Sequence, residues 1–377
     1  MYDCVIVGAG PAGSTAAYHL AKAGRSVLLL DRATLPRYKP CGGGVSPQIA
    51  QWFDFDLTPA ISVKVSKVRY TWRLQEPIEM ELQTAEPLWM VRRDRFDHFL
   101  VQQAQRQGAQ LQDGTKVTGI EFQSDRWQVN TLQAPVTGRY LIAADGARGS
   151  LAKWLGFNNR RYLLGGALEA EPRLDMPSEP IMHFEFGLLK NGYAWNFPKA
   201  DGYSIGGGVF RSGRHQKYDL RPPLTQYAAE FGLEAAQVKQ HGHPLLSWDG
   251  EQTLHTQQAV LAGESACVVD PFTAEGIRPA IFSGLKAAQA IDQALGGDID
   301  ALANYTRLMN EEWGGEMRWA KRLAQAFYQV PKLAYNLGIK HPGSTDKMLK
   351  VFCGELGYAD VAQKAIQRLS MGLISGR

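Results

Sequence analysis

Apolar residues in the first thirty positions form two short runs separated by a helical pattern. Residues 3–7 (DCVIV) and 26–30 (SVLLL) are nearly unbroken apolar runs, which is typical of buried parallel strands. Between them, residues 11–23 repeat small apolar side chains at helical spacing and end at Gly24, a residue that suits the end of a helix. The pattern predicts a strand, a glycine turn, a helix and a second strand.

The pattern of apolar positions changes after residue 60. Residues 63–74 and 78–82 have the composition of strands and predict a hairpin that turns at Glu76-Pro77. Residues 96–107 then have the spacing of a helix. This stretch therefore departs from the strand–helix–strand pattern of the first thirty residues.

Residues 160–255 predict a second sheet. Strand-like stretches at 181–186 and 203–210 are separated by Gly and Pro turns, as in an antiparallel sheet. A buried apolar run returns at 259–262, and a long helical pattern follows at 277–295. Beyond these elements, the chain is mostly helical in pattern.

The order of these elements predicts an α/β fold. We expect a discontinuous Rossmann-like nucleotide-binding domain of the glutathione-reductase type, an inserted antiparallel-sheet domain that binds the substrate, and a helical C-terminal region. The expected boundaries are 1–60, 89–158 and 256–298 for the nucleotide-binding domain, 61–88 and 159–255 for the inserted domain, and 299–377 for the helical region.

Composition and charge narrow the class of protein. Hydrophobic residues make up 45% of the chain and charged residues 21%, as in a packed globular protein. The net charge of +4 comes from scattered Lys and Arg, which argues against nucleic-acid binding and allows only weak attraction to anionic membranes. No apolar run has the length of a membrane span, and the sequence begins directly with a strand. We expect a cytoplasmic protein and leave peripheral membrane contact open.

Cysteine and histidine spacing argues against a metal centre. The 4 cysteines lie far apart and form no CxxC pair, which disfavours iron–sulfur and zinc sites and fits a reducing compartment. His241 and His243 would share one exposed face of a strand and lack a third ligand. We therefore predict no metal site.

Residues 8–13 (GAGPAG) match the GxGxxG dinucleotide fingerprint. The glycines permit a tight turn, close approach of a pyrophosphate to the backbone, and close packing of helix on strand. The helix that begins near Pro11 directs its positive end at the phosphates, and Asp31 ends the second strand where a carboxylate suits a ribose hydroxyl. An ordinary glycine turn is the alternative. The predicted nucleotide contacts are Gly8, Gly10, Pro11, Ala12, Gly13, Asp31 and Arg32.

Two later segments favour FAD as the dinucleotide. Residues 140–150 (YLIAADGARGS) resemble the DG motif of flavoproteins related to p-hydroxybenzoate hydroxylase, and residues 260–279 (VLAGESACVVDPFTAEGIRP) resemble their downstream FAD motif. The resemblance implies that an acidic residue, here Glu264, binds the ribityl chain and that the turn at Pro271 passes the flavin. Glu264 stands where these flavoproteins usually have Asp, and Asp31 stands where many have Glu.

Three further segments resemble a narrower family. Residues 37–44 (RYKPCGGG), 93–97 (RDRFD) and 191–198 (NGYAWNFP) are similar to the KPCGG, RxxFD and GYxWxFP segments of the geranylgeranyl reductase family of FAD-dependent oxidoreductases. The additional FAD contacts implied by these resemblances are Cys41, Gly42, Arg93, Asp145, Gly146, Gly263, Glu264, Pro271, Gly276 and Ile277.

Two of the expected FAD contacts have alternatives. Backbone N–H groups near Gly276, at the start of the helix predicted at 277–295, would stabilise the negative charge of a reduced flavin, or that helix would only pack on the sheet. Arg93 would either bond the FAD or cap local structure.

The family resemblance implies reduction of isoprenoid C=C double bonds by hydride transfer from reduced FAD. The substrate would be an apolar prenyl or isoprenoid-linked small molecule. A flavin-dependent aromatic or polyketide monooxygenase, and a non-catalytic flavin or prenyl-lipid binding protein, stay open as alternatives. The chain has a single GxGxxG, so both NADPH bound near Asp145 and a ferredoxin-like protein are candidate electron donors.

The aromatic residues of the 191–198 segment are the expected substrate wall. Tyr193, Trp195 and Phe197 alternate, so along a strand their side chains share one face. A plain aromatic core stripe is the alternative. The implied substrate contacts are Gly43, Gly44, Tyr193, Trp195, Phe197 and Pro198, and the implied catalytic residues are Cys41, Tyr193 and Trp195. For Cys41, proton donation, contact with the alkene, loop rearrangement and simple burial on a tight turn all stay open.

Overall fold

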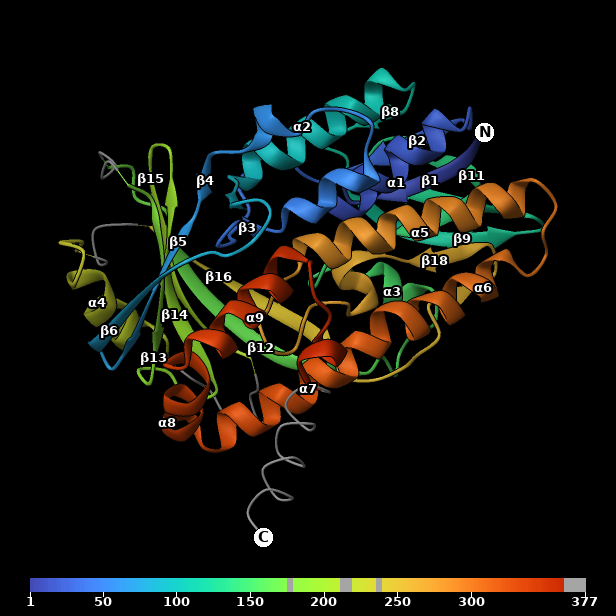
Figure 1. Ribbon diagram of the computed structural model, residues 1–377. Coiled ribbons are helices and arrows are strands. Elements are labelled where there is room, and N and C mark those ends of the chain that lie inside the picture. The colour runs from blue at the N-terminus through green and yellow to red at the C-terminus, as the bar shows by residue number, and fades with distance from the viewer. Residues whose placement is uncertain (175–178, 211–218, 235–238, 363–377) are drawn as a thin grey trace, which may run out of the picture.

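The computed structural model describes residues 1–174, 179–210, 219–234 and 239–362. Two large sheets form the two sides of the molecule, and the C-terminal helices run alongside both (Figure 1). The last part of the predicted helical region, beyond residue 362, lies outside the described residues.

The first sheet has eight strands and a parallel centre. β1 (Tyr2–Val7) lies between β2 (Val27–Leu30) and β11 (Val136–Ala143) and pairs in parallel with both. β2, residues 4–7 of β1 and residues 141–143 of β11 are buried because helices or loops cover both faces, which explains the apolar runs there. The other strands are β8 (Gln110–Gln112), β9 (Val117–Gln123), β10 (Arg126–Thr131), β17 (His255–Thr256) and β18 (Ala259–Leu261).

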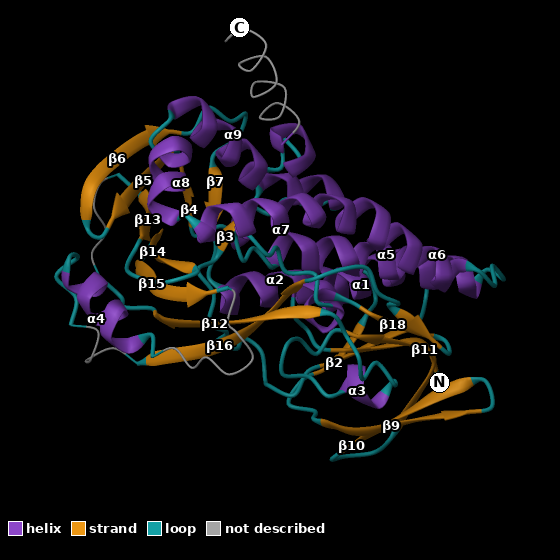
Figure 2. Ribbon diagram, turned by 90° about the horizontal axis from the view of Figure 1, so that it is seen from below, coloured by secondary structure: helices purple, strands orange, loops and turns teal. Residues whose placement is uncertain are grey.

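Three long helices lie on one side of this sheet (Figure 2). α1 (Pro11–Lys22) packs against both α2 (Arg93–Arg106) and α5 (Ile277–Leu295). α5 has the predicted bounds, whereas α2 begins before the predicted start at residue 96. Helices α1 and α5 approach closely because Gly284 faces the backbone of Ala12, where an added Cβ would lie 2.2 Å from the carbonyl oxygen.

The second sheet has seven strands and is mixed, which corrects the prediction of an antiparallel sheet. β13 (Ile181–Phe186) pairs in parallel with β5 (Lys67–Trp72), because a segment far upstream in the chain joins the sheet at that edge. All its other strand pairs among the described residues are antiparallel. The remaining strands are β6 (Gln75–Glu81), β12 (Tyr162–Ala170), β14 (Gly192–Lys199), β15 (Gly202–Val209) and β16 (Gln240–Trp248).

The predicted hairpin turn at Glu76-Pro77 was wrong by a few residues. The turn is made by Arg73 and Leu74, whose φ angles are 51° and 62°. Pro77 instead lies inside β6. β6 is the edge strand, where the missing N–H of a proline costs no ladder hydrogen bond.

A small three-stranded sheet joins the two large ones. It consists of β3 (Gly44–Val45), β4 (Val63–Val65) and β7 (Leu88–Met90). β3 begins at Gly44, the last residue of the 37–44 segment, so this sheet fixes one end of that segment.

The C-terminal region packs at the junction of the sheets. Trp313 donates its indole N–H to the Val268 carbonyl, and the Tyr358 hydroxyl donates to the Asp270 carboxylate, so the C-terminal region is anchored to the loop before α5. No helix in the described part of the chain is long and apolar enough to cross a bilayer. The remaining helices are α3 (Leu151–Trp154), α4 (Arg221–Ala229), α6 (Ala301–Leu308), α7 (Gly314–Gln329), α8 (Pro331–Ala334) and α9 (Pro342–Cys353), with π-helical turns η5 (Met309–Trp313) and η6 (Tyr335–Ile339).

Candidate functional site

A cavity of about 500 Å³ lies between the two large sheets. Its nucleotide half is formed by the turn after β1, the end of β2, the residues after β11 and the start of α5. Its aromatic half is formed by the inner face of β14 and the neighbouring strands. The loop of residues 37–44 lines both halves. A cavity of this size is typical of cofactor and small-molecule sites.

The glycine turn in the nucleotide half is built from backbone in close contact. Gly8 has a φ of +108°, and an added Cβ there would lie 2.2 Å from the Ala144 carbonyl oxygen. An added Cβ at Gly13 would lie 1.9 Å from the Gly8 carbonyl oxygen. At Gly10, by contrast, the nearest atom is 3.8 Å away, so the space beside Gly10 is open. Larger residues at Gly8 and Gly13 are therefore incompatible with this turn.

Asp31 at the end of β2 is fixed by the protein on both carboxylate oxygens. The backbone N–H of Ala9 donates to Oδ2 over 2.9 Å, and that of Ala33 donates to Oδ1 over 2.9 Å. Arg37 also reaches Oδ2, over 3.3 Å. The carboxylate is thereby held at the edge of the cavity, where its position suits a ribose hydroxyl.

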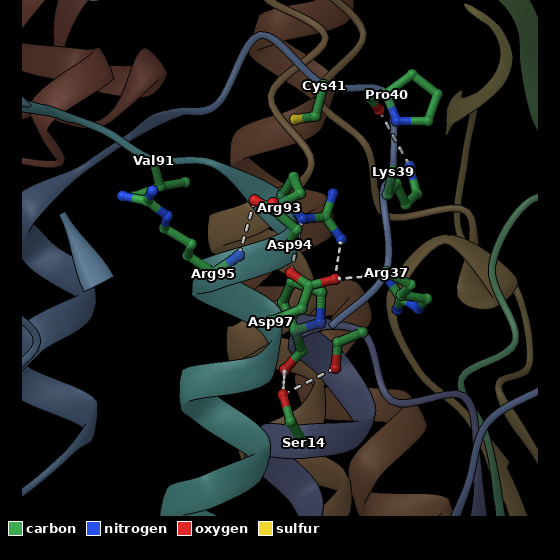
Figure 3. Close-up of polar contacts among 12 residues, drawn as sticks. Ser14, Arg37, Lys39, Pro40, Cys41, Val91, Arg93, Asp94, Arg95 and Asp97 are labelled. Atoms are coloured by element: carbon green, nitrogen blue, oxygen red, sulfur yellow. Dashed lines mark hydrogen bonds and ion pairs between the residues drawn. The ribbon is translucent and has the colours of Figure 1, made fainter. Parts of the chain in front are cut away.

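Arg93 is held by Asp97, which favours the local role that the sequence left open. Two guanidinium nitrogens of Arg93 bond the two oxygens of Asp97 over 2.7 and 2.8 Å, and Arg37 bonds the same carboxylate over 3.0 Å. Figure 3 shows both arginines directed at Asp97, with Cys41 further along the loop. Arg93 still lines the cavity. Sequence reasoning missed Arg37 and Asp97 as a site-forming pair, although both lie inside the matched motifs.

Two buried charged residues of the second sheet hold the loop of residues 37–44. Glu169 Oε1 accepts the Cys41 backbone N–H over 2.6 Å and the Tyr38 hydroxyl over 3.0 Å. Lys199 donates to the Gly42 carbonyl over 2.6 Å. Burial raises the pKa of Glu169 to about 7, and burial lowers the pKa of Lys199 to about 8. Neither residue was predicted, because nothing in the sequence near them shows that they meet this loop.

The DG motif and the downstream FAD motif are joined by hydrogen bonds. The Ser265 hydroxyl donates to Asp145 Oδ1 over 2.9 Å and accepts the Gly146 backbone N–H over 2.9 Å. Asp145 Oδ2 accepts the Leu151 backbone N–H over 3.0 Å. Burial raises the pKa of Asp145. These bonds give both motifs a fixed position at the cavity.

Glu264 lies at the cavity wall with its carboxylate bonded to the protein. Oε1 accepts the Leu246 backbone N–H over 3.1 Å, and Oε2 lies 3.0 Å from His243 Nε2. Burial raises the pKa of Glu264, but the hydrogen bond from His243 and the nearby charges lower it by more, so the net shift is downward. The expectation that His241 and His243 share an exposed face was wrong for His243, because that side chain is mostly buried against Glu264.

Two helices begin at the cavity without a side-chain cap. The N-terminal residue of α1 is preceded by Gly10 and that of α5 by Gly276, and neither start is capped by a side chain. Free N–H groups and the positive end of a helix suit anionic groups. Together with the open space at Gly10, they fit the pyrophosphate of FAD at α1 and a negatively charged flavin at α5.

Glu275, immediately before Gly276, is a cavity residue that the sequence analysis missed. Its side chain is 8% exposed, and Oε2 forms an ion pair of 3.1 Å with Arg278. Oε1 is buried and has no hydrogen-bond partner among the described residues. Burial raises the pKa of Glu275 to about 7. Its place directly before the predicted flavin contact Gly276 was the available signal.

The alternating aromatic residues of β14 line one half of the cavity. Tyr193, Trp195 and Phe197 project from the same face of β14 and all line the cavity. Phe184 of β13 packs edge-on against both Tyr193 and Phe197, with ring centroids 5.2 Å apart in each pair. The paired strand β15 has Gly206 beside Trp195, and the absence of a side chain there leaves room for the Trp195 ring. The stripe is thus both core and cavity lining.

Most of the predicted site residues come together at this one cavity. Gly13 is covered by the turn, and Pro198 and Pro271 do not reach the lining. Among the described residues, no group of three or more potential ligands is placed to hold a metal ion. The predicted residues that line the cavity are Gly8, Gly10, Pro11, Ala12, Asp31, Arg32, Cys41, Gly42, Gly43, Gly44, Arg93, Asp145, Gly146, Tyr193, Trp195, Phe197, Gly263, Glu264, Gly276 and Ile277.

Comparison with known proteins agrees with this geometry. Residues 1–163 match the family model described as an FAD binding domain. The sequence is 30% identical over 347 residues to a menaquinone reductase of Mycobacterium tuberculosis, covering 85% of this chain and 83% of that protein. It is 29% identical over 343 residues to a digeranylgeranylglycerophospholipid reductase of Methanothermobacter thermautotrophicus, covering 84% of each chain.

A solved structure shares the complete fold. The crystal structure of a geranylgeranyl bacteriochlorophyll reductase-like protein from Thermoplasma acidophilum superposes with a TM-score of 0.78 at 23% sequence identity, covering 97% of this chain and 95% of that chain. The predicted α/β fold and the FAD cofactor are therefore confirmed. The chain belongs to the geranylgeranyl reductase family of FAD-dependent oxidoreductases.

Proposed function

We propose that this protein reduces the C=C double bonds of an isoprenoid chain. The observation that carries the proposal is that the aromatic wall of β14 and the glycine turn after β1 face one cavity. An apolar chain and a flavin can then lie in contact, away from water. Apolar lining with few polar groups is what an isoprenoid chain requires.

The substrate class is supported by the relatives and by the lining. The two similar reductases are named for menaquinone and for a digeranylgeranyl lipid, which have different head groups and share an isoprenoid chain. A cavity that recognises the chain through Tyr193, Trp195 and Phe197 fits that shared part.

The residues of this chain have separate roles in the proposed reaction. FAD, when bound and reduced, supplies the hydride. Gly8, Gly10 and Asp31 hold its adenosine diphosphate part, and the start of α5 at Gly276 stabilises negative charge on the flavin. The loop of residues 37–44 lines both halves of the cavity, so it would lie beside the flavin, and Cys41 would contact the alkene.

The electrons that reduce the flavin come from NADPH or from a ferredoxin-like protein. The chain has a single GxGxxG, so NADPH would bind transiently near Asp145. Anaerobic mixing of the oxidised protein with NADPH, and separately with reduced ferredoxin, distinguishes the two donors by the rate at which the flavin absorbance bleaches.

Peripheral contact with a membrane would give the protein access to such a substrate. Val330, Leu333 and Leu337 are exposed side chains on α8 and the adjoining turns, and Leu337 is 68% exposed. Tyr335, the first residue of η6, is instead buried against Trp72. We infer that this exposed apolar ridge lies on the lipid surface. In co-sedimentation with phosphatidylglycerol vesicles, L333E should bind the vesicles less than the wild type. L132E, which changes an exposed leucine outside this ridge, should bind them like the wild type.

The decisive experiment is anaerobic. The purified holoprotein is reduced with dithionite, geranylgeraniol is added, and flavin reoxidation and product mass are followed together. A gain of two hydrogens per double bond supports the proposal. A product that is heavier by one oxygen, formed only when oxygen is admitted, would instead support the monooxygenase alternative. Reduced FAD that no isoprenoid reoxidises would support a non-catalytic binding protein.

A further inference from the structure

Reduction of an alkene needs an acid as well as a hydride, and the inference drawn here rests on the proposed function. When one alkene carbon gains a hydride, its neighbour must gain a proton from a positioned acid or from water. The aromatic half of the cavity is apolar, so the candidates for a positioned donor are the acidic side chains in the lining and the Cys41 thiol, which the experiment below tests separately.

Two of those carboxyl groups are already occupied by the protein. Glu169 accepts hydrogen bonds on both oxygens, from the Cys41 backbone and Tyr38 on one and from Ser204 on the other. Glu264 is likewise bonded on both oxygens, and its pKa is shifted downward, which keeps it ionised. Neither carboxyl has a free oxygen to offer to a substrate.

Two other acidic groups are also committed. Both oxygens of Asp145 are bonded by the protein, one by Ser265 and the other by the Leu151 backbone, on the nucleotide side of the cavity. The Tyr193 hydroxyl donates to the Thr273 carbonyl over 2.5 Å, and burial raises the pKa of Tyr193 far above its ordinary value. The hydroxyl proton of Tyr193 is therefore held by the backbone.

Glu275 differs from all of these because one of its oxygens has no partner. Oε2 is fixed by Arg278, while Oε1 is buried next to the cavity and makes no hydrogen bond to any described residue. A buried, unpaired carboxylate oxygen is costly, whereas a protonated carboxyl group has an O–H to donate. Burial favours the protonated form of Glu275 and the ion pair with Arg278 favours the charged form, so the pKa of the group lies at about 7.

The surroundings of Glu275 place it between the flavin side and the substrate side. Arg278 on α5 favours its charged form, and Asp270 in the preceding loop disfavours it. From the packed elements, Tyr193 of β14 and Cys353 of α9 are the titratable groups that interact with it. Tyr193 belongs to the aromatic wall, and Gly276, the residue after Glu275, is the N-cap of α5.

We propose that Glu275 is the proton donor of the double-bond reduction. One alkene carbon receives a hydride from the reduced flavin and its neighbour receives the proton of the Glu275 carboxyl group. The π bond breaks as two C–H bonds form, and the flavin loses two electrons. The Glu275 carboxylate then regains a proton from water, and the two electrons are those that dithionite supplied before the isoprenoid was added.

The test compares E275Q with the wild type in single-turnover reduction of geranylgeraniol by the dithionite-reduced holoprotein. The amide keeps the size of the side chain and removes the acid, so the rate should fall on the order of 100-fold, as is typical for loss of a general acid. The wild-type rate should fall as the pH rises above about 7, where Glu275 ionises. The E275Q rate should not change there. E311Q, at an exposed ion pair on the surface, is the matched control and should react like the wild type.

A second readout does not depend on turnover. Infrared pH titration should show a protonated carboxyl band that disappears near pH 7 and is partly missing in E275Q. Because Glu169 titrates in the same range, E169Q is needed to assign its share of the band.

The outcomes separate this proposal from the proposed function. If the wild type does not reduce geranylgeraniol at all, the proposed function fails. If the wild type reduces it at a rate that is constant up to pH 9, or if E275Q reacts as fast as the wild type, Glu275 is not the donor. Loss of the pH dependence in C41A and not in E275Q would assign the proton to Cys41 and overturn the proposal.

Discussion

The nucleotide half of the cavity is made largely of backbone, whereas the aromatic half is made of side chains. In the nucleotide half, Gly8 and Gly13 bring strand, turn and helix so close that a single added carbon has no room. In the aromatic half, Tyr193, Trp195 and Phe197 fill space against neighbouring rings, and their contacts are between side chains.

This difference sets how each half tolerates change. Backbone in contact with backbone cannot relax, so one methyl group is enough to disturb the nucleotide half. Aromatic rings can be exchanged for similar rings at a modest cost in packing. We therefore expect the nucleotide half to control whether FAD binds at all, and the aromatic half to control which chain is accepted.

The largest effect on FAD binding is expected from G13A in the nucleotide half. The new Cβ would lie 1.9 Å from the Gly8 carbonyl oxygen, so the turn must open. We expect FAD affinity to fall about 100-fold, which corresponds to about 2.7 kcal/mol. The thermal midpoint of the apoprotein should fall as well. Fluorescence titration with FAD and thermal unfolding measure the two effects.

G10A is the matched control for G13A. The added Cβ at Gly10 meets no atom within 3.8 Å, so the thermal midpoint should stay near that of the wild type. FAD binding should still weaken about tenfold, because the methyl group takes space that the pyrophosphate needs. Wild-type FAD affinity in G10A would contradict a pyrophosphate at this glycine.

E169Q tests the junction where the second sheet holds the loop of residues 37–44. Burial raises the folded-state pKa of Glu169 from 4.5 to about 7, so the native state binds more protons than the unfolded state between these values. The wild type should therefore lose stability as the pH rises from 4.5 to 7, by up to about 3 kcal/mol. E169Q should lose less over that range. Chemical unfolding at pH 5 and pH 8 gives the free energy of unfolding of each protein. An equal change between the two pH values in the wild type and in E169Q would refute the prediction.

W195F tests the aromatic half by a ring-for-ring exchange. The smaller ring removes the indole hydrogen bond to Ser204 and leaves a gap over Gly206. We expect KM for geranylgeraniol to rise about tenfold, or about 1.4 kcal/mol, while FAD affinity changes less than about twofold. A loss of FAD as large as that of the isoprenoid would show that the two halves are not separable.

C41A should have the smallest effect. The loop is held at Cys41 through its backbone N–H, which alanine keeps. We expect bound FAD to be retained and the turnover of geranylgeraniol to fall less than about tenfold, as for loss of one contact of about 1 kcal/mol. A loss of more than about 100-fold with FAD retained would indicate that the thiol takes part in the chemistry.

The parts of the site that the sequence predicted share one property. Gly8 to Gly13 and the end of β2 at Asp31 form a continuous segment, so the turn, the helix start and the carboxylate follow from local order alone. The aromatic alternation at Tyr193, Trp195 and Phe197 also follows from strand geometry. In each case the residues that act together are close in the chain.

The contacts that the sequence did not predict join distant segments. Glu169 and Lys199 hold Cys41 and Gly42 from more than a hundred residues away. The parallel pairing of β5 with β13 is of the same kind, and it turned an expected antiparallel sheet into a mixed one. The exposed histidine face was wrong because Glu264, from another segment, covers His243.

The sequence by itself determined the nucleotide fold, the cofactor and the family, because glycine positions and short motifs impose steric demands within a few residues. Only the tertiary structure decided which carboxyl oxygens in the cavity have no hydrogen-bond partner. Whether a carboxyl oxygen has a partner depends on what the rest of the chain brings to it, and Glu275 Oε1 alone among those compared is left without one in the described part of the molecule. The glycine turn could thus be predicted from the sequence, whereas the proposed proton donor was indicated only by its burial and its missing hydrogen bond in the structure.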